Sequence, residues 1–537
     1  MPLAPGRPGA VDRRLFLRGA AAAGLAASAA ACSSSASASG RPRPTGSSAA
    51  PAATATRASA SPSATPADWS ELGRQLGGRL VRPGDAAYPQ ALQLFDPRFD
   101  AIRPAGIAYA GSAADVAAGL RFSASTGVPL AVRSGGHSYA GYSSGPGLVL
   151  DVTRLATVTP RAGGTATVGA GARLVDVYST LAAAGVSIPA GSCPTVGIAG
   201  LALGGGQGVV GRKYGLTSDR MIGAEVVLAS GETVRVDENH DADLFWALRG
   251  GGGGNFGVVT SFTFATHPTR SLALFSYRWD WSHASEVLGA WLGWAPFAPD
   301  ELWSNCVLSA AGGTTPRISV SGVYVGSSDA AAPVVRRLLG GVGAAPVSSF
   351  LADRGYLPAM LIEAGCAGMT VPACHLPTQN PAGTLSRVAQ LAASDYVNAP
   401  LSTAGRAAVT AGIERRSATP GAGGGAIAFD SYGGAINRVS PSSTAFVHRG
   451  ALACIQYTAG YSTSASATSK KTNAAWLADF HTSMRPYVDG YAYQNYIDAN
   501  LPDWQHAYYG ANADRLKRVK REYDPRGLFH FAQAIAG

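Results

Sequence analysis

Metal-binding patterns are missing from this sequence, and cysteine is scarce. The chain of 537 residues has no H-E-x-x-H, Cys-x-x-Cys or Asp/Asn-rich calcium loop, so we expect no protein-bound metal. Six cysteines are too few for a disulfide scaffold in a chain of this length. Cys366 and Cys374 are near enough in sequence to bridge, and both a disulfide and two free thiols remain open. Cys306 and Cys454 sit among apolar neighbours and are expected in the core.

Charge is also scarce, and much of it lies at one end. Charged residues make up 14% of the chain and hydrophobic residues 46%, which allows a large core. The net charge is +10, but seven Arg and one Asp in residues 1–67 account for +6, so the remainder carries only about +4. No Lys/Arg run interleaved with aromatic residues follows, and we expect no nucleic-acid partner.

Two glycine motifs lack the context that would give them their usual meaning. GYSSG at 141–145 has the G-x-S-x-G spacing of a hydrolase, but Pro146 and Gly147 lead into a strand where a helix is required. Residues 206–211 spell G-x-G-x-x-G, yet the following RKYGLTSD does not predict a helix. Neither a serine hydrolase nor a Rossmann dinucleotide site is expected.

The N-terminus is typical of an export signal. Arg13 and Arg14 precede an Ala-rich run that is too short to span a bilayer, which resembles a twin-arginine leader over 1–32. Cys32 closes AAAC, so lipid attachment at Cys32 and simple cleavage nearby both remain open. Residues 33–67 are mostly Ser, Ala, Pro and Thr and are expected to form a disordered linker. The mature protein is then extracellular or a cell-surface lipoprotein.

The remaining pattern is α+β, with glycine-rich loops between the elements. The loop RSGGHSYAGYSSG follows a short apolar strand directly, and bare Gly and Ser N–H groups at a strand end form a cradle for a phosphate. His137 lies in the middle of this loop. Expected elements are a helix over 113–126, strands over 129–133, 148–152 and 165–171, a helix over 173–185 and a hairpin over 225–236.

Long motifs in a fixed order resemble one enzyme family. RSGGHSYAGYS, GSCPTVGIAGLALGGGQGVVGRKYGLTSD, DADLFWALRGGGGGNFGVVTSF, YAYQNYID and YYGANADRLKRVKREYDPRGLFHFAQAI resemble the berberine bridge enzyme-like flavoproteins, with a vanillyl-alcohol-oxidase or PCMH-type FAD domain. The resemblance implies FAD bonded covalently to His137 through the flavin 8-methyl carbon and to Cys193 through flavin C6. A ring nitrogen beside a phosphate cradle and a thiol in a Gly-lined pocket are suitable nucleophiles for this chemistry.

The resemblance also implies the catalytic groups. Tyr496, in YQNY, corresponds to the base that removes the proton of a substrate hydroxyl, and a phenol needs polar help to do so at neutral pH. Asp430 and Gln456 are the predicted helpers, although roles as a turn residue and a strand hydrogen-bonder remain open for them. Cys454 replaces a longer polar residue, which leaves the reaction subclass open. The residues predicted to contact FAD are Arg133, Ser134, Gly135, Gly136, His137, Ser138, Cys193, Val196, Gly197, Gly200, Gly205, Tyr214, Gly257, Val259 and Asn495.

Val196 and the tryptophans carry two further expectations. In the resembling family the Val196 position lies over the flavin carbon that reacts with oxygen, and valine leaves room for O2 where leucine fills it, so an oxidase is predicted. Simple packing of the loop is the alternative. Five of the nine Trp lie at 279, 281, 291, 294 and 303, where core packing is favoured over a wall for stacking sugars.

The predicted protein is therefore an α+β FAD enzyme. A two-subdomain PCMH-type FAD-binding domain covers 68–270, a substrate domain with an antiparallel sheet covered by helices covers 271–490, and 491–537 returns to the FAD domain. The preferred function is oxidation of a secondary alcohol or sugar hemiacetal carbon in a small-molecule or oligosaccharide substrate, with O2 as acceptor. The alternatives are cyclisation or desaturation of a secondary metabolite, a dehydrogenase with another acceptor, and an exported flavin-carrying binding protein without turnover.

Overall fold

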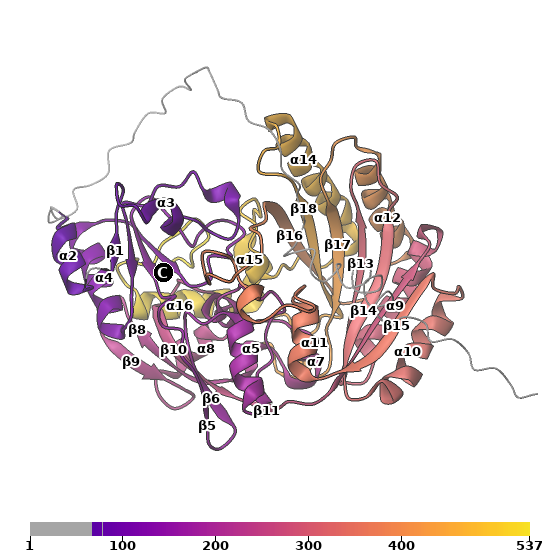
Figure 1. Cartoon of the computed structure of the whole chain (residues 1–537), viewed down its shortest axis with the longest axis horizontal. Coiled ribbons are helices and arrows are strands. Elements are labelled where there is room, and N and C mark those ends of the chain that lie inside the picture. The colour runs from indigo at the N-terminus through magenta and orange to yellow at the C-terminus, as the bar shows by residue number, and fades with distance from the viewer. Residues whose placement is uncertain (1–66, 78) are drawn as a thin grey trace, which may run out of the picture.

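A computed structural model describes residues 67–77 and 79–537 of the chain (Figure 1). The predicted leader, Cys32 and residues 33–66 of the predicted linker lie outside the described residues. No helix within the described ranges is long and apolar enough to cross a membrane.

The described part begins with a small four-stranded sheet. Its strand order is β1-β2-β4-β3, with β2, β4 and β3 parallel and β1 antiparallel to β2. Helix α4 (Ala113–Thr126) is the crossover from β2 to β3, which run parallel on either side of β4; Ser112 caps its start and Gly127, at a φ of 72°, ends it. The strands are β1 (Leu80–Val81), β2 (Gly106–Tyr109), β3 (Leu130–Arg133) and β4 (Leu148–Asp151), with α2 (Trp69–Gln75) and α3 (Tyr88–Ala91) beside them.

A second, antiparallel sheet follows in the same half of the molecule. Its order is β5-β6-β10-β8-β9, and its apolar side chains join the four-stranded sheet in one core. The strands are β5 (Val158–Arg161), β6 (Thr165–Gly169), β8 (Met221–Val227), β9 (Thr233–Val236) and β10 (Val258–Ala265). The connecting helices are α5 (Leu174–Ala183), α6 (Ile198–Leu203), α7 (Gly211–Tyr214) and α8 (Ala242–Leu248). A two-stranded ribbon of β7 (Val186–Ser187) and β11 (His267–Pro268) lies at its edge.

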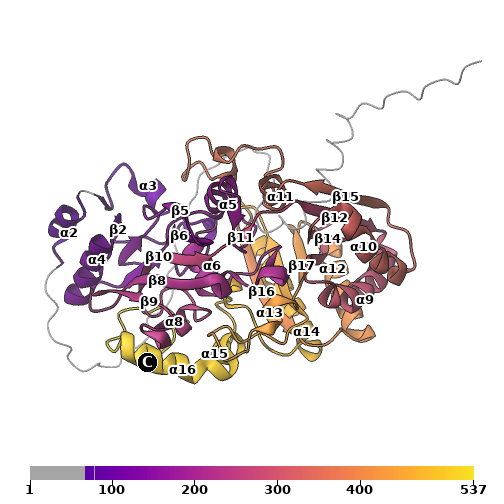
Figure 2. The same cartoon turned by 90° about the horizontal axis from the view of Figure 1, so that it is seen from below.

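A seven-stranded antiparallel sheet forms the other half. Its order is β15-β12-β14-β13-β17-β18-β16. Four helices cover one face, and the other face turns toward the first half (Figures 1 and 2). Its strands are β12 (Leu272–Trp279), β13 (Leu302–Ala310), β14 (Arg317–Val325), β15 (Ser348–Arg354), β16 (Gln390–Val397), β17 (Gly425–Ser431) and β18 (Ala453–Gly460). The covering helices are α9 (Ala284–Trp294), α10 (Ser328–Val342), α12 (Thr403–Ala418) and α14 (Ala467–Met484).

The C-terminal segment runs back beneath the first half. Helix α16 (Ala513–Tyr523) lies against α8, and α15 (Trp504–Tyr509) packs beside α16 (Figure 2). Lys520 anchors α16 because its buried ammonium donates to Asp524 Oδ2, Asn255 O and Phe529 O, each at 2.7 Å. These bonds hold the C-terminal segment against the loop that contains Asn255.

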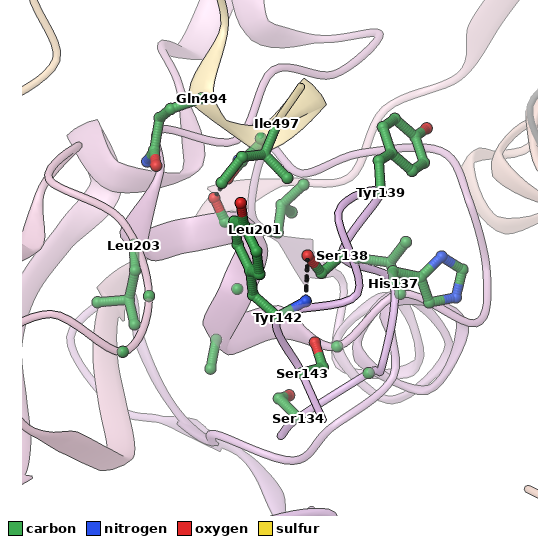
Figure 3. A pocket seen from close by; sticks show the side chains of 18 of the residues that line it. Ser134, His137, Ser138, Tyr139, Tyr142, Ser143, Leu201, Leu203, Gln494 and Ile497 are labelled. Carbon is green, nitrogen blue, oxygen red and sulfur yellow. Dashed lines mark hydrogen bonds between the residues drawn. The ribbon is translucent and has the colours of Figure 1, made fainter. Parts of the chain in front are cut away.

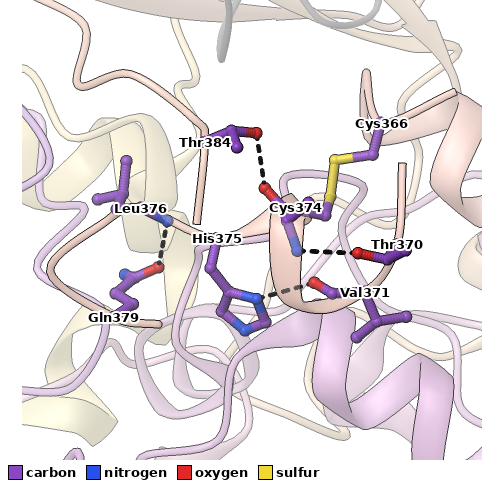
Figure 4. The surroundings of a disulfide bond; sticks show 9 residues. Cys366, Thr370, Val371, Cys374, His375, Leu376, Gln379 and Thr384 are labelled. Atoms are coloured by element: carbon purple, nitrogen blue, oxygen red, sulfur yellow. Dashed lines mark hydrogen bonds between the residues drawn. A yellow bond between two sulfur atoms is a disulfide. The ribbon is translucent and has the colours of Figure 1, made fainter. Parts of the chain in front are cut away.

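A disulfide-bonded loop joins the two halves. Cys366 and Cys374, between α11 (Tyr356–Glu363) and β16, form a disulfide with a Cα–Cα distance of 5.8 Å (Figure 4). The Nε2 atom of His375 lies 3.1 Å from Asp176 Oδ2 on α5. Burial lowers the pKa of His375, but the hydrogen bond and the charge of Asp176 raise it, and the pKa lies above its ordinary value. The bridge that the sequence left open is present, while Cys306 and Cys454 are buried free thiols as expected.

The structure confirms the local expectations closely. The helix over 113–126, the strands after it and the hairpin with its turn at Gly231, at a φ of 86°, are all present. Trp279, Trp291, Trp294 and Trp303 are buried, which confirms core packing, although Trp303 also reaches the cavity described below. One local expectation is wrong: a single helical turn, α7, does follow Gly208, because Gly211 and the residues after it close i→i+4 bonds before Gly215 ends the turn.

Candidate functional site

A cavity of about 570 Å³ lies between the two halves of the molecule. Glycine-rich loops of the first half form one wall, alternate residues of β13, β17 and β18 form the opposite wall, and the C-terminal segment closes it. In Figure 3 the loop that carries Ser134 to Ser143 faces Leu201 and Leu203, with Gln494 and Ile497 above. The volume falls within the range of small-molecule and cofactor sites.

His137 stands on the loop that leaves β3. Its Nε2 atom lies 2.9 Å from Thr195 Oγ1, and its ring stacks on Phe95 with the centroids 4.0 Å apart. Burial, followed by the nearby charge of Arg173, lowers the pKa of His137 to about 3. The imidazole is therefore neutral at physiological pH and keeps a basic lone pair.

Cys193 and Val196 line the cavity from the neighbouring loop. This loop meets the His137 loop at Gly135 and Gly197, where the backbones approach so closely that a Cβ on either residue would collide with the other loop. Glycine at both positions is thus a packing requirement. The two predicted attachment residues consequently lie on one continuous wall.

The β wall presents side chains of three strands to the cavity. Successive residues of a strand face opposite sides, so Asn305 on β13, Asp430 on β17 and Gln456 on β18 project inward with small neighbours such as Ala428 between them. Gln456 donates through Nε2 to Tyr139 Oη at 3.1 Å. Asn305 accepts from Ser321 Oγ at 2.6 Å, which fixes its amide.

Tyr496 enters from the C-terminal segment, on a single 3-10 turn, Gln494–Tyr496. Its ring stacks at 6.0 Å on Tyr139 and meets Tyr493 edge-on at 5.0 Å. Gln207 Nε2 donates to Tyr496 Oη at 2.8 Å and to Asp430 Oδ2 at 3.2 Å. One amide therefore links the two predicted acid–base groups.

Burial controls the protonation of both groups. Desolvation raises the pKa of Asp430 to about 7, and the hydrogen bond from Gln207 acts against this rise. Desolvation, and then the Asp430 charge, hold the pKa of Tyr496 well above its usual value. Asp430 is thus poised near neutrality, whereas the Tyr496 phenol keeps its proton in this environment.

Most of the predicted site residues meet at this cavity, and three do not. Arg133 is buried and paired with Asp151. Tyr214 stacks on His267 with the ring centroids 3.8 Å apart, and a Cβ at Gly205 would press on the Phe446 ring. The predicted residues that line the cavity are Ser134, Gly135, Gly136, His137, Ser138, Cys193, Val196, Gly197, Gly200, Gly257, Val259, Asp430, Gln456, Asn495 and Tyr496. Arg133, Gly205 and Tyr214 instead pack the loops behind it.

Sequence reasoning missed several polar residues of the site. Gln207, Tyr139, Asn305 and Tyr493 all line the cavity. Gln207 was visible as the only polar side chain in GGGQG, and Tyr139 follows the SGGHS motif directly. Their partners lie far away in the chain, at a separation of 289 residues for Gln207 and Tyr496, so no local pattern connects them.

The chemistry of the wall fits an FAD molecule. Gly200, Gly253 and Gly254 line the cavity without a Cβ, and Ser134 and Ser138 add hydroxyl groups. Of the described residues that line the cavity, none is Lys or Arg, so backbone N–H groups are the donors offered to a pyrophosphate. The predicted attachment residues His137 and Cys193 lie on the same wall.

Comparisons with known proteins agree with this assignment. Residues 104–237 match the family described as FAD binding domain, and residues 492–536 match the family described as Berberine and berberine like. The chain is 31% identical to an uncharacterized FAD-linked oxidoreductase of Bacillus subtilis, YgaK, over 86% of this chain and 97% of that protein. It is also 31% identical to a chitooligosaccharide oxidase of Gibberella zeae, over 80% of this chain and 87% of the relative.

Solved structures show the same arrangement. The structure of Physcomitrella patens BBE-like 1 superposes with a TM-score of 0.78 at 31% identity, covering 86% of this chain and 98% of that one. The likeness spans both halves of the molecule and the C-terminal segment, so the predicted α+β fold is confirmed at the level of the whole described chain.

Proposed function

The chain belongs to the berberine bridge enzyme-like family of FAD-linked oxidoreductases, and from this premise we propose that it oxidises a secondary alcohol or the hemiacetal carbon of a sugar. The observation that carries the proposal is the Asp430–Gln207–Tyr496 cluster, in which an amide of the glycine-rich loop meets a carboxyl of the β wall and a phenol of the C-terminal segment in one cavity. These proton acceptors therefore share one cavity with the glycine-rich loops that fit FAD. The flavin, when bound, accepts the hydride.

The chain's own residues handle the proton of the substrate hydroxyl. Because burial keeps the Tyr496 phenol protonated, it first releases its own proton to solvent in the cavity; its Oη then receives the proton of the substrate hydroxyl, and the Gln207 N–H stabilises the negative charge that this oxygen carries in its deprotonated form. Asp430, with a pKa of about 7, is a second proton acceptor, and it accepts a hydrogen bond from the same Gln207 amide. Gln456 and Tyr139, joined at 3.1 Å, offer donors and acceptors for further substrate hydroxyls.

We propose that FAD is attached twice, to His137 and to Cys193; each new bond would replace a C–H bond of the flavin, with loss of protons and with two electrons that reduce the flavin ring and then pass to O2. A neutral imidazole is the nucleophilic form, and burial keeps His137 neutral by lowering its pKa to about 3. Both residues line the cavity on adjoining loops. Two bonds would retain the cofactor while substrate and product enter and leave the cavity.

The proposal also covers the electron acceptor of the reduced flavin and the export of the protein. Val196 lines the cavity wall beside Cys193, and its short side chain supports O2 as the acceptor, with H2O2 as the product.

The paired arginines of the leader support export through a twin-arginine-type route, with Cys32 as a lipid anchor or a cleavage site.

A substrate screen tests the proposed reaction. Chitobiose, cellobiose, lactose, glucose and simple secondary alcohols are mixed anaerobically with the purified protein, and bleaching of the flavin is followed; H2O2 is measured in air. We expect bleaching by at least one reducing oligosaccharide, since a relative is named a chitooligosaccharide oxidase. Bleaching only by polyketide or alkaloid compounds would move the reaction to metabolite tailoring, and bleaching by none of them would favour the binding protein without turnover.

A further inference from the structure

Gln207 stands in a run of glycines that lets its backbone approach the C-terminal segment. The Gly206 N–H donates to Tyr493 Oη at 2.9 Å and the Gln207 N–H to the same oxygen at 3.3 Å. Gly206 has a φ of 83°, which disfavours any residue with a side chain. A Cβ added at Gly208 would collide with Ala190 O, so both positions require glycine. The position of the Gln207 side chain is therefore set from its backbone.

The orientation of the Gln207 amide follows from its partners. The ionised Asp430 carboxylate accepts hydrogen bonds and cannot donate them, so in this state the amide nitrogen must face Asp430. The amide oxygen then accepts from Tyr432 Oη at 2.9 Å, and Tyr432 is buried against Tyr396 with their hydroxyls 3.2 Å apart. A flipped amide would set its oxygen against the ionised Asp430 carboxylate, where no hydrogen bond can form.

This orientation forces the Tyr496 oxygen to act as an acceptor. The second N–H of Gln207 points at Tyr496 Oη at 2.8 Å, so the phenol cannot donate its own proton to Gln207. Within residues 67–77 and 79–537 no side chain or carbonyl accepts that proton. It points into the cavity, where solvent takes it before the Tyr496 oxygen accepts the proton of a substrate hydroxyl.

The same amide is the chief stabiliser of the Asp430 carboxylate. The titratable groups around Asp430 are Tyr432 just after the end of β17, Cys454 on β18, and Tyr139, Tyr493 and Tyr496 from loops and the C-terminal segment. All of these are neutral near pH 7, because burial raises the pKa of each of them above its ordinary value. The Gln207 N–H is the single influence that lowers the pKa of Asp430.

We propose that Gln207 is a positioning residue that holds Tyr496 and Asp430 on the two N–H bonds of one amide, and so sets the direction of the Tyr496 proton and the ionisation of Asp430. The inference rests on the proposed function, in which these two groups handle the substrate proton. No bond is made or broken by Gln207 itself. Its effect is on which atoms carry protons before the substrate arrives.

The experiment uses the visible spectrum of the flavin-loaded protein, and no substrate. The spectrum is recorded between pH 5 and 9 for the wild type, Asp430→Asn, Gln207→Met and Gln207→Glu. We expect a wild-type transition near pH 7 that Asp430→Asn abolishes. Gln207→Met, which keeps the volume but removes both donors, should move the midpoint up by about one pH unit, and Gln207→Glu should move it further because it adds a like charge.

Gln533→Met is the matched control. Gln533 lines the same cavity but donates to Asp498 O at 2.8 Å, so its loss should leave the midpoint unchanged. An unmoved midpoint in Gln207→Met, or no transition that depends on Asp430, overturns the inference. The proposed function fails separately, if Tyr496→Phe and Asp430→Asn reduce their flavin as fast as the wild type.

Discussion

His137 Nε2 and Thr195 Oγ1 lie 2.9 Å apart, although 58 residues separate them in the chain. The contact ties the loop after β3 to the loop that carries Cys193, and the Gly135–Gly197 approach locks the same two loops together. With Nε2 bound to Thr195, Nδ1 is the ring nitrogen without a hydrogen-bond partner among the described residues. The predicted covalent links to FAD therefore start from a rigid pair of loops.

The first prediction concerns these links. FAD should remain on the wild-type chain after acid precipitation, and His137→Ala or Cys193→Ala should each keep one bond. Only the double variant should release the cofactor. Mass spectrometry of the intact chain, with flavin fluorescence of the denatured protein on a gel, measures the outcome. Free flavin in the supernatant of the acid-treated wild type would contradict both links.

The second prediction concerns the proton acceptors. Tyr496→Phe should keep covalent flavin and lower the rate of anaerobic flavin reduction by roughly 10²- to 10⁴-fold, as is typical for the loss of a general base. Asp430→Asn should also slow reduction, and it should abolish the rise in rate as pH increases through about 7, the pKa of this carboxyl. Stopped-flow reduction with the best sugar of the screen, from pH 5 to 9, gives both results. Unchanged reduction in Tyr496→Phe would place the base at Asp430.

The third prediction concerns oxygen. Val196→Leu adds one methylene to a wall that already packs against the core, so it should close the space for O2 and slow reoxidation of the reduced flavin by at least about tenfold. Mixing the reduced protein with air-saturated buffer measures the rate. Reduction by substrate should be little changed, which makes it the internal control. Slow reoxidation in the wild type would point to a dehydrogenase with another acceptor.

The fourth prediction concerns acid stability. His448 is buried, with Nε2 3.1 Å from Tyr508 O, and burial lowers its pKa to about 3. Below pH 6.5 the His448 ring binds a proton in the unfolded chain but stays neutral in the folded protein. The contribution of His448 to the free energy of unfolding is therefore complete above pH 6.5 and falls as the pH decreases. The expected loss is about 2 kcal/mol at pH 5. Urea unfolding at pH 7 and 5 should show a smaller loss in His448→Gln than in the wild type.

His240→Asn serves as the control for this experiment. The His240 side chain is 72% exposed and pairs with Asp237 at the surface, so its replacement should leave the pH dependence of unfolding as it is in the wild type. An equal loss of stability between pH 7 and 5 in wild type and His448→Gln would show that other groups control acid unfolding.

Local sequence determined much of this protein. The glycine loops, the strand before His137, the helix over 113–126 and the hairpin ending at Val236 follow from spacing and turn residues that act over a few positions. Alternation in ACIQY also placed Gln456 on the inward face of its strand. These features depend on neighbours in the chain, which is why the sequence was enough to predict them.

Only the tertiary structure decided how the site is assembled. Gln207 meets Asp430 and Tyr496 across 223 and 289 residues, because the seven-stranded sheet and the C-terminal segment both close on the loop between α6 and α7. The same packing turned Arg133, Gly205 and Tyr214 away from the cavity and raised the pKa of Asp430. Burial and long-range hydrogen bonds arise when separate elements pack together, and no short stretch of sequence encodes them.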